Sequence, residues 1–184
     1  MKICIIGASG HFEYALAEKN IDFCGFAPGS PDEEVSESQR REIEKRGARF
    51  FPDHRIMLDK QQPDVAVINP HFYLNGRITI ECLKRGIHCF TEKPLSFYED
   101  ELSQIEQIAN TGPAQLVTMM YYRYHPAFYA AIQTAKNGVI GQVIQINAQK
   151  SYKMGKKPTW MQERKKFGGL ISWVGIHALD WIYE

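Results

Sequence analysis

The chain has 184 residues, which is room for one domain or for one domain and part of another. With 44% hydrophobic and 23% charged residues it has the composition of a globular protein, which excludes a disordered or fibrous one. A net charge of +1 from scattered basic residues leaves no electrostatic footprint for nucleic acid, and the apolar runs are too short to cross a membrane.

The first predicted strand, Lys2–Ile6, runs into a glycine-bearing turn and a predicted helix, Phe12–Lys19. In this context the backbone N–H groups of the turn can bind a pyrophosphate, with help from the helix dipole. The full fingerprint places Gly at positions 7, 9 and 12, and this chain keeps Gly7 and adds Gly10. A plain strand-to-helix turn stays open as the alternative. Because the strand starts so early, we expect no signal or transit peptide before it.

The second predicted strand, Ile21–Ala27, ends without the Asp or Glu that holds a ribose 2′-OH in many NAD sites. Ser30, just beyond it, can instead hydrogen-bond a 2′-phosphate, so NAD and NADP are both open. Arg40 and Arg41 could add charge, but they lie in a predicted helix, Glu33–Arg46. There Arg41 is spaced to pair with Glu37, which is typical of a solvated face.

Three more strands are predicted in the first half, at Ala48–Phe51, Asp64–Ile68 and Ile87–Thr91. Helical segments separate them: Arg55–Lys60, and a helix with Leu74, Ile78 and Cys82 on one face that ends at Gly86. Alternating strands and helices predict an α/β fold, a Rossmann-type doubly wound parallel sheet.

The fifth strand leads into Glu92-Lys93-Pro94, the first chemically distinctive segment. Ligands of open α/β sheets bind at the carboxyl ends of the strands. Pro94 fixes the backbone after Lys93 and an apolar strand precedes it, so the ammonium is expected at that edge as a functional group. The alternative is an ordinary solvated lysine.

The second half changes pattern. Its predicted elements are a helix at Tyr98–Asn110, a strand at Gln115–Tyr122, a helix at Pro126–Asn137, a strand with one covered face at Gly141–Tyr152, a basic loop at Lys153–Lys166 and a helix at Gly168–Tyr183. One long strand and one helix cannot bury an independent core. Either the chain is a fragment, or its second part packs on the first part or on another subunit.

His177 is the second chemical candidate, on the last predicted helix. Trp173 and Trp181 lie four residues away on either side, and Asp180 lies three residues on. The spacing fits a core histidine, and it also fits a general base oriented by its neighbours.

Four cysteines complete the inventory. Cys4, Cys24 and Cys89 lie in predicted strands, and Cys82 lies in a helix. No pair has metal-ligand spacing, so we expect buried, reduced thiols in a cytoplasmic protein and no metal site.

Several motifs together resemble the Gfo/Idh/MocA oxidoreductases, the family of glucose-fructose oxidoreductase and the inositol dehydrogenases. They follow the family's order over nearly the whole chain: Ile5-Ile6-Gly7-Ala8-Ser9-Gly10-His11, Pro63-Asp64-Val65-Ala66-Val67-Ile68-Asn69-Pro70, Gly86-Ile87-His88-Cys89-Phe90-Thr91-Glu92-Lys93-Pro94-Leu95, Tyr122-Arg123-Tyr124-His125-Pro126-Ala127-Phe128, Gly138-Val139-Ile140-Gly141-Gln142-Val143, and Gly168-Gly169-Leu170 with Gly175-Ile176-His177-Ala178-Leu179-Asp180. The Glu-Lys-Pro segment and the final Gly-Gly…His-x-x-Asp segment are the specific ones.

The resemblance implies an NAD(P)-dependent dehydrogenase that oxidises a hydroxyl of a sugar or cyclitol, working as a homo-oligomer. It implies a dinucleotide-binding Rossmann domain over residues 1–120 and the start of a truncated α+β substrate and dimerisation domain over 121–184. It implies catalytic roles for Lys93, which contacts the reacting hydroxyl and the cofactor, and for His177, as acid/base. It implies that NAD or NADP contacts Gly7, Ala8, Ser9, Gly10, His11, Phe12, Ala27, Pro28, Asn69, Pro70, His71, Glu92 and Lys93. Candidate substrate contacts are Arg123, Trp160 and Asp180.

Three departures keep other functions open. Trp173 stands where many members have an Asp, Asn75 stands where many have a His, and the ribose-binding carboxylate is absent. The alternatives are a non-catalytic nucleotide or sugar sensor and an inactive truncated chain.

Overall fold

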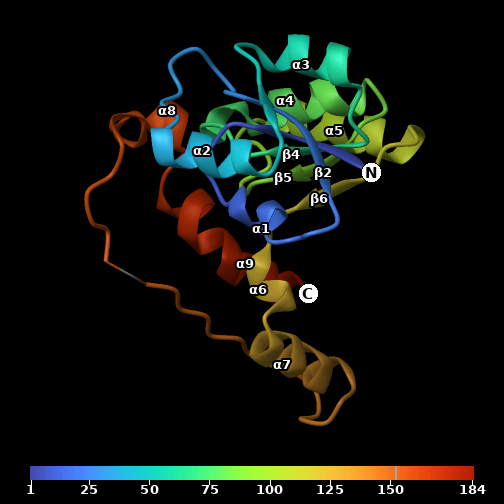
Figure 1. The fold of residues 1–184 in the computed structure, drawn as a ribbon. Helices are drawn as coiled ribbons and strands as arrows, with labels where there is room; N and C mark the ends of the chain where they lie inside the picture. The colour runs from blue at the N-terminus through green and yellow to red at the C-terminus, as the bar shows by residue number, and fades with distance from the viewer. Residues whose placement is uncertain (152) are drawn as a thin grey trace.

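The computed structural model describes residues 1–151 and 153–184, and its first part is a six-stranded sheet in the order β3-β2-β1-β4-β5-β6 (Figure 1). Every neighbouring pair is parallel. The strands are β1 (Lys2–Ile6), β2 (Asp22–Ala27), β3 (Arg49–Phe50), β4 (Val65–Ile68), β5 (His88–Thr91) and β6 (Leu116–Thr118). The predicted doubly wound sheet is confirmed. Because the strand order reverses between β1 and β4, their carboxyl ends flank the crevice in which such folds bind ligands.

Helices and single helical turns connect and follow the strands. They are α1 (Glu13–Leu16), α2 (Glu37–Lys45), α3 (His54–Gln61), the 3₁₀ turn η1 (Phe72–Leu74), α4 (Asn75–Leu83), α5 (Glu99–Thr111), α6 (Tyr121–Tyr124), α7 (Pro126–Lys136), the 3₁₀ turn η2 (Thr159–Gln162), α8 (Arg164–Phe167), the π-helical turn η3 (Ile171–Gly175) and α9 (Ile176–Tyr183).

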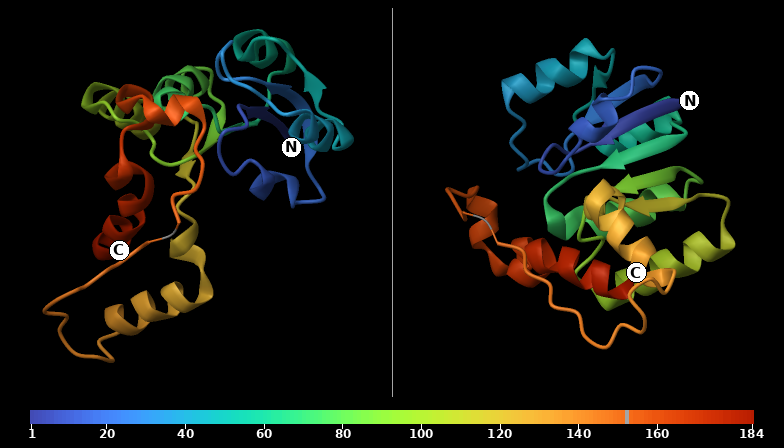
Figure 2. Two further views of the ribbon diagram at one scale, coloured as in Figure 1. Left: turned by 90° about the vertical axis from the view of Figure 1, so that its left-hand side faces the viewer. Right: turned by 90° about the horizontal axis from the view of Figure 1, so that it is seen from below.

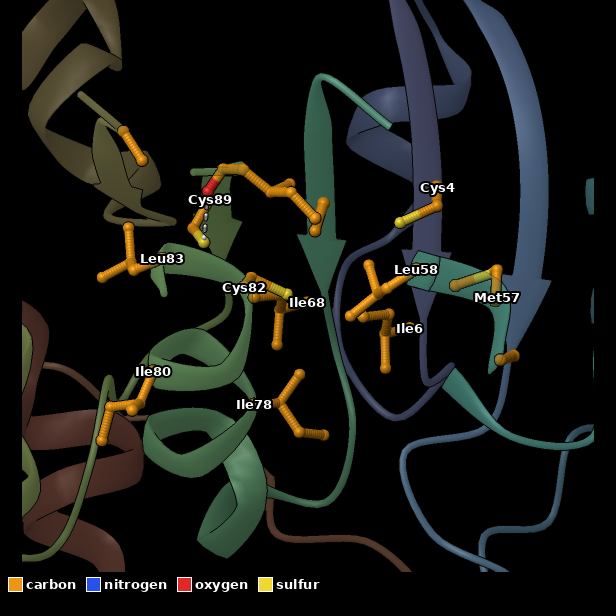
Figure 3. Packing of buried hydrophobic residues seen from close by; sticks show 14 of the residues in the cluster. Cys4, Ile6, Met57, Leu58, Ile68, Ile78, Ile80, Cys82, Leu83 and Cys89 are labelled. Carbon is orange, nitrogen blue, oxygen red and sulfur yellow. Dashed lines mark hydrogen bonds between the residues drawn. The ribbon is translucent and has the colours of Figure 1, made fainter. Parts of the chain in front are cut away.

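The core has one layer on each face of the sheet, since alternate strand residues point to opposite sides. On one face Leu58 of α3 and Ile78 of α4 pack with strand residues such as Ile68 (Figure 3). On the other, Leu16 of α1 and Ile43 of α2 pack with the opposite set. The cysteines are free thiols, as predicted, but only Cys4, Cys82 and Cys89 are buried, whereas Cys24 is half-buried.

Two early helices are shorter than predicted. α1 ends at Leu16 rather than Lys19. The Arg46 guanidinium donates hydrogen bonds to the carbonyls of Leu16 and Glu18. α2 begins after Ser36, whose side chain and that of Gln39 form a capping box. Within α2, Arg41 pairs with Glu37 on an exposed face, as predicted.

The strands predicted after β5 differ most from the structure. β6 stops at Thr118, and Tyr121–Tyr124 is helical instead of extending the strand. Residues 143–151 form no strand, although their apolar side chains alternate, and Tyr152 lies outside the described residues. No described segment pairs with them, so no ladder can form, and the Ile144 side chain is 93% exposed. The predicted basic loop Lys153–Lys166 contains η2 and part of α8.

The second part of the chain lies at one edge of the Rossmann sheet. α6 packs on α9 close to the sheet, whereas α7 projects away from it (Figures 1 and 2). Within residues 1–151 and 153–184, no helix is both long enough and apolar enough to span a bilayer.

Candidate active site

The glycine turn after β1 lies at the carboxyl edge of the sheet and is built for close backbone approach. Gly7 has φ +78°, a conformation that favours glycine, and a Cβ there would come within 2.4 Å of the Pro70 backbone. Its N–H donates to the Ala27 carbonyl at 2.8 Å. The turn thus brings together the ends of β1, β2 and β4. Phe12, predicted to contact the cofactor, is buried in the core behind the turn.

Glu33 supplies this turn with a carboxylate, which the sequence argument missed. Its Oε1 accepts from the Ala8 N–H at 3.0 Å and the Ser9 Oγ at 2.6 Å, and its Oε2 accepts from the Gly29 N–H at 2.7 Å. The side chain comes from the loop after β2, six positions beyond the strand end. The end of β2 itself carries no carboxylate, as the sequence indicated, but the loop beyond it brings one to this edge. The sequence placed Glu33 at the start of a predicted helix, whereas the structure places it in the loop before α2.

The end of β4 carries buried polar atoms that fit a nucleotide. Asn69 is fully buried, and neither its Oδ1 nor its Nδ2 has a hydrogen-bond partner among the described residues. The buried His71 also lacks a partner for Nδ1 in the described part of the chain, and burial lowers its pKa. Unpaired buried polar atoms are costly, so a ligand that pairs them would be favoured. The unpaired atoms of Asn69 and His71 therefore fit the polar groups of a nucleotide.

Glu92 lies directly behind the turn and links it to Lys93. Its Oε2 accepts from the His11 N–H at 2.9 Å and lies 2.6 Å from His11 Nδ1, and its Oε1 accepts from the Lys93 N–H at 2.9 Å. The hydrogen bond to Glu92 raises the pKa of His11. Burial opposes ionisation of Glu92, but His11 and Lys93 outweigh it and lower its pKa. The pair therefore favours a carboxylate facing an imidazolium.

Asn75, which stands where many relatives have a His, fixes the turn that carries Lys93. Its side-chain amide donates to the carbonyls of Glu92 at 2.9 Å and Pro94 at 2.8 Å. Asn75 is fully buried at the start of α4. It thereby ties that helix to the end of β5.

Lys93 is buried at the carboxyl edge of the sheet, where the sequence predicted it. Its Nζ donates to the Trp173 carbonyl at 2.9 Å and lies 5.5 Å from the centre of the Phe72 ring. Burial lowers its pKa, and the charge of Glu92 partly opposes that shift.

His177 reaches the same region from α9, 84 positions further along the chain. It is buried edge-on against Tyr122, with ring centres 4.9 Å apart. Burial, then the charges of Lys150 and Lys93, lower its pKa to about 4. The imidazole is therefore neutral at pH 7 and can accept a proton.

Lys93 and His177 line one cleft of about 940 Å³, together with His11, Lys150 and several aromatic side chains. The cleft lies between the sheet edge and the second part of the chain. Sequence reasoning identified both candidate catalytic residues but not Lys150, which lies in the mispredicted strand.

The three predicted substrate residues lie elsewhere. The Arg123 Nε donates to both oxygens of the buried Asp180 carboxylate, at 2.8 and 2.9 Å, and thereby ties α6 to α9. Trp160 stacks on His71, with ring centres 4.7 Å apart, beside the end of β4. None of the three lines the cleft that holds Lys93 and His177.

Comparison with known proteins places this site in context. A family model described as "Oxidoreductase family, NAD-binding Rossmann fold" (Gfo/Idh/MocA) matches residues 1–121. A candidate oxidoreductase from Thermotoga maritima is 38% identical in sequence and has a TM-score of 0.92, over 100% of this chain and 57% of its own. GenD2 from gentamicin A biosynthesis, solved in complex with NAD, shares the fold at 16% identity and a TM-score of 0.78, over 98% of this chain and 52% of its own.

A curated relative is an uncharacterized oxidoreductase from Synechocystis. It is 22% identical over 132 residues, which are 70% of this chain and 35% of that protein. The chain therefore spans between about a third and just over half of the length of these proteins.

Proposed function

The chain belongs to the Gfo/Idh/MocA oxidoreductase family, and from this premise we propose that it carries the catalytic pair of an NAD(P)-dependent dehydrogenase. The reaction is oxidation of a hydroxyl on a sugar- or cyclitol-like substrate. The observation that carries the proposal is that Lys93 and His177, far apart in sequence, line one cleft beside the glycine turn. In this proposal residues 1–120 hold the cofactor, and residues 121–184 begin the substrate domain.

We propose NAD rather than NADP as the cofactor. Gly7, Ala8, Ser9, Gly10 and His11 would face the pyrophosphate, and Asn69 and His71 would hydrogen-bond from the end of β4. Glu33 supports the choice, since a carboxylate accepts from a ribose 2′-OH and repels a 2′-phosphate. Ser30, which the sequence offered as a partner for the 2′-phosphate of NADP, lies in the same loop as Glu33 and carries no positive charge.

Lys93 and His177 have different roles toward the substrate hydroxyl. The neutral His177 imidazole takes the hydroxyl proton, and the Lys93 ammonium stabilises the alkoxide that develops as the proton leaves. Bound NAD would supply the hydride acceptor for the carbon that carries this hydroxyl. Buried surroundings make both electrostatic effects stronger than they would be in water.

The test is NADH formation with a panel of sugars and cyclitols, each offered with NAD and with NADP. Lys93→Met and His177→Asn should each lower turnover by about 10²- to 10⁴-fold. Lys84→Met, which removes an exposed lysine outside the cleft, is the matched control and should change nothing. Full activity in either cleft variant would exclude that residue from catalysis.

A second candidate function is a sensor that binds nucleotide and sugar without turnover. Two observations favour it: the Lys93 Nζ is engaged by the Trp173 carbonyl, and His177 Nδ1 has no orienting acceptor among the described residues. Under this reading NAD binds, no NADH forms with any of the panel, and Lys93→Met leaves NAD affinity unchanged. NADH formation that depends on Lys93 would rule it out.

A further inference from the structure

The cleft that holds Lys93 and His177 is lined by basic side chains from separate parts of the chain. We propose that its sugar-like substrate carries a negative charge, as a carboxylate or a phosphate. This inference rests on the proposed function, because it concerns the substrate of the same cleft.

Three basic side chains meet there. His11 comes from the glycine turn, Lys93 from the end of β5, and Lys150 from the irregular segment before residue 152. The two lysine charges act on each other across the cleft: burial is the main cause that lowers the pKa of Lys93, and the charge of Lys150 lowers it further. A bound anion would relieve this repulsion.

No Asp or Glu is among the described residues that line the cleft. Two carboxylates that act on His177 are turned to other partners. Glu92 is 1% exposed and accepts from His11 and from the Lys93 backbone, while Asp180 is held by Arg123. Glu92 carries one negative charge against those of Lys93 and Lys150, which leaves net positive charge on the described wall of the cleft.

Lys150 has the placement of a recognition residue. Its Nζ lies 3.8 Å from the centre of the Tyr122 ring, on the same aromatic wall that His177 contacts. A cation over an aromatic face keeps its charge available on the opposite side. Its role does not require proton transfer, so it can be removed without removing the catalytic pair.

The aromatic lining sets the size and kind of ligand. Tyr122 and Trp181 pack edge to face, with ring centres 5.8 Å apart, and both line the cleft. Aromatic faces bind the apolar C–H face of a sugar ring, while charged groups fix its orientation. A cleft of about 940 Å³ accommodates one ring with an anionic substituent.

Binding to the NAD-loaded chain tests the inference without requiring turnover. The probes are gluco-, galacto- and manno-configured sugars, each as the neutral hexose, the hexuronate and the hexose 6-phosphate, titrated by calorimetry. We expect at least one anionic form to bind ten times or more tighter than its neutral hexose. Its identity distinguishes a carboxylate from a phosphate. Equal or tighter binding of the neutral sugars, or no binding by any probe, overturns the inference.

The variant Lys150→Met tests whether the preference for anionic sugars arises in the cleft. It should weaken the anionic probe about tenfold and leave the neutral hexose unchanged, whereas Lys156→Met, at an exposed position outside the cleft, should change neither. Loss of both probes equally would show that Lys150 is structural and would count against the inference. Failure of the proposed function is a separate result, namely the absence of NADH formation with the ligands that bind.

Discussion

The surroundings of His177 disfavour its charged form, with consequences for stability as well as chemistry. Burial and two nearby lysines lower its pKa from 6.5 to about 4. At pH values between these two pKa values, His177 is mostly protonated in the unfolded chain and mostly neutral in the folded chain. Stability linked to His177 is complete above about pH 6.5 and is lost as pH falls toward 4.

We predict that His177→Gln flattens this dependence. Between pH 6.5 and 4.5 the wild type should lose about 1–2 kcal/mol more unfolding free energy than the variant, because only it must bury an imidazole that tends to protonate. Urea unfolding at several pH values measures this. His125→Gln, at a partly exposed histidine, is the control and should follow the wild type. Parallel curves for wild type and His177→Gln would contradict the account.

Asn75 gives a second prediction at the residue scale. Asn75→Ala removes two hydrogen bonds to the Lys93 turn and should cost about 1–3 kcal/mol of unfolding free energy. Asn75→Asp should cost more, because a carboxylate would face the Glu92 and Pro94 carbonyls it cannot donate to. Thermal melts of both variants decide the point. A stability order with Asp above Ala would show that the amide is not the donor.

The site residues differ in how far their positions could be predicted from the sequence. Lys93 was predictable because the apolar strand before it and Pro94 after it fix its position by local rules. Glu33 was not, since its carboxylate reaches the glycine turn only through the path of the loop after β2. Lys150 enters the cleft through a segment whose course depends on tertiary packing.

At the scale of elements, the ion pair between α6 and α9 positions His177. The Asp180 carboxylate is buried and satisfied by Arg123, which also contacts Glu184 at 2.8 Å. We predict that Asp180→Asn costs about 1–3 kcal/mol and also lowers turnover, because α9 loses its anchor. Urea unfolding and NADH formation measure the two effects.

A double-mutant cycle separates the pair from other effects of the substitution. Arg123→Met alone leaves a buried carboxylate unpaired, so adding it to Asp180→Asn should cost less than the sum of the two single changes. Strictly additive losses would mean that the two side chains do not stabilise each other, and α9 would need another anchor.

The predicted strands form where the chain itself supplies a strand to pair with. β1, β2, β4 and β5 form near their predicted bounds because each pairs with another strand of this chain. Residues 143–151 have the alternation of a strand, but alternation shows which face is apolar and supplies no partner. α2 began later than predicted because a local cap at Ser36 overrode the helix-forming residues before it.

At the scale of the whole molecule, oligomeric state stays a prediction of the family resemblance. Apolar side chains such as Ile144 and Ile146 are exposed in the irregular segment, and such surface favours association. We expect sedimentation velocity to show a dimer or larger species at micromolar concentration. A single monomer over the whole concentration range would contradict this.

The proposed NAD site lies at the sheet edge around Gly7, Glu33 and Asn69. Titration of NAD and of NADP into this chain, followed by calorimetry at one ionic strength, tests it most directly. The account predicts that NAD binds at least ten times tighter than NADP, and that Glu33→Gln, which keeps the shape of the side chain, removes most of that difference. Tighter binding of NADP, or no binding of either nucleotide at millimolar concentration, would contradict it.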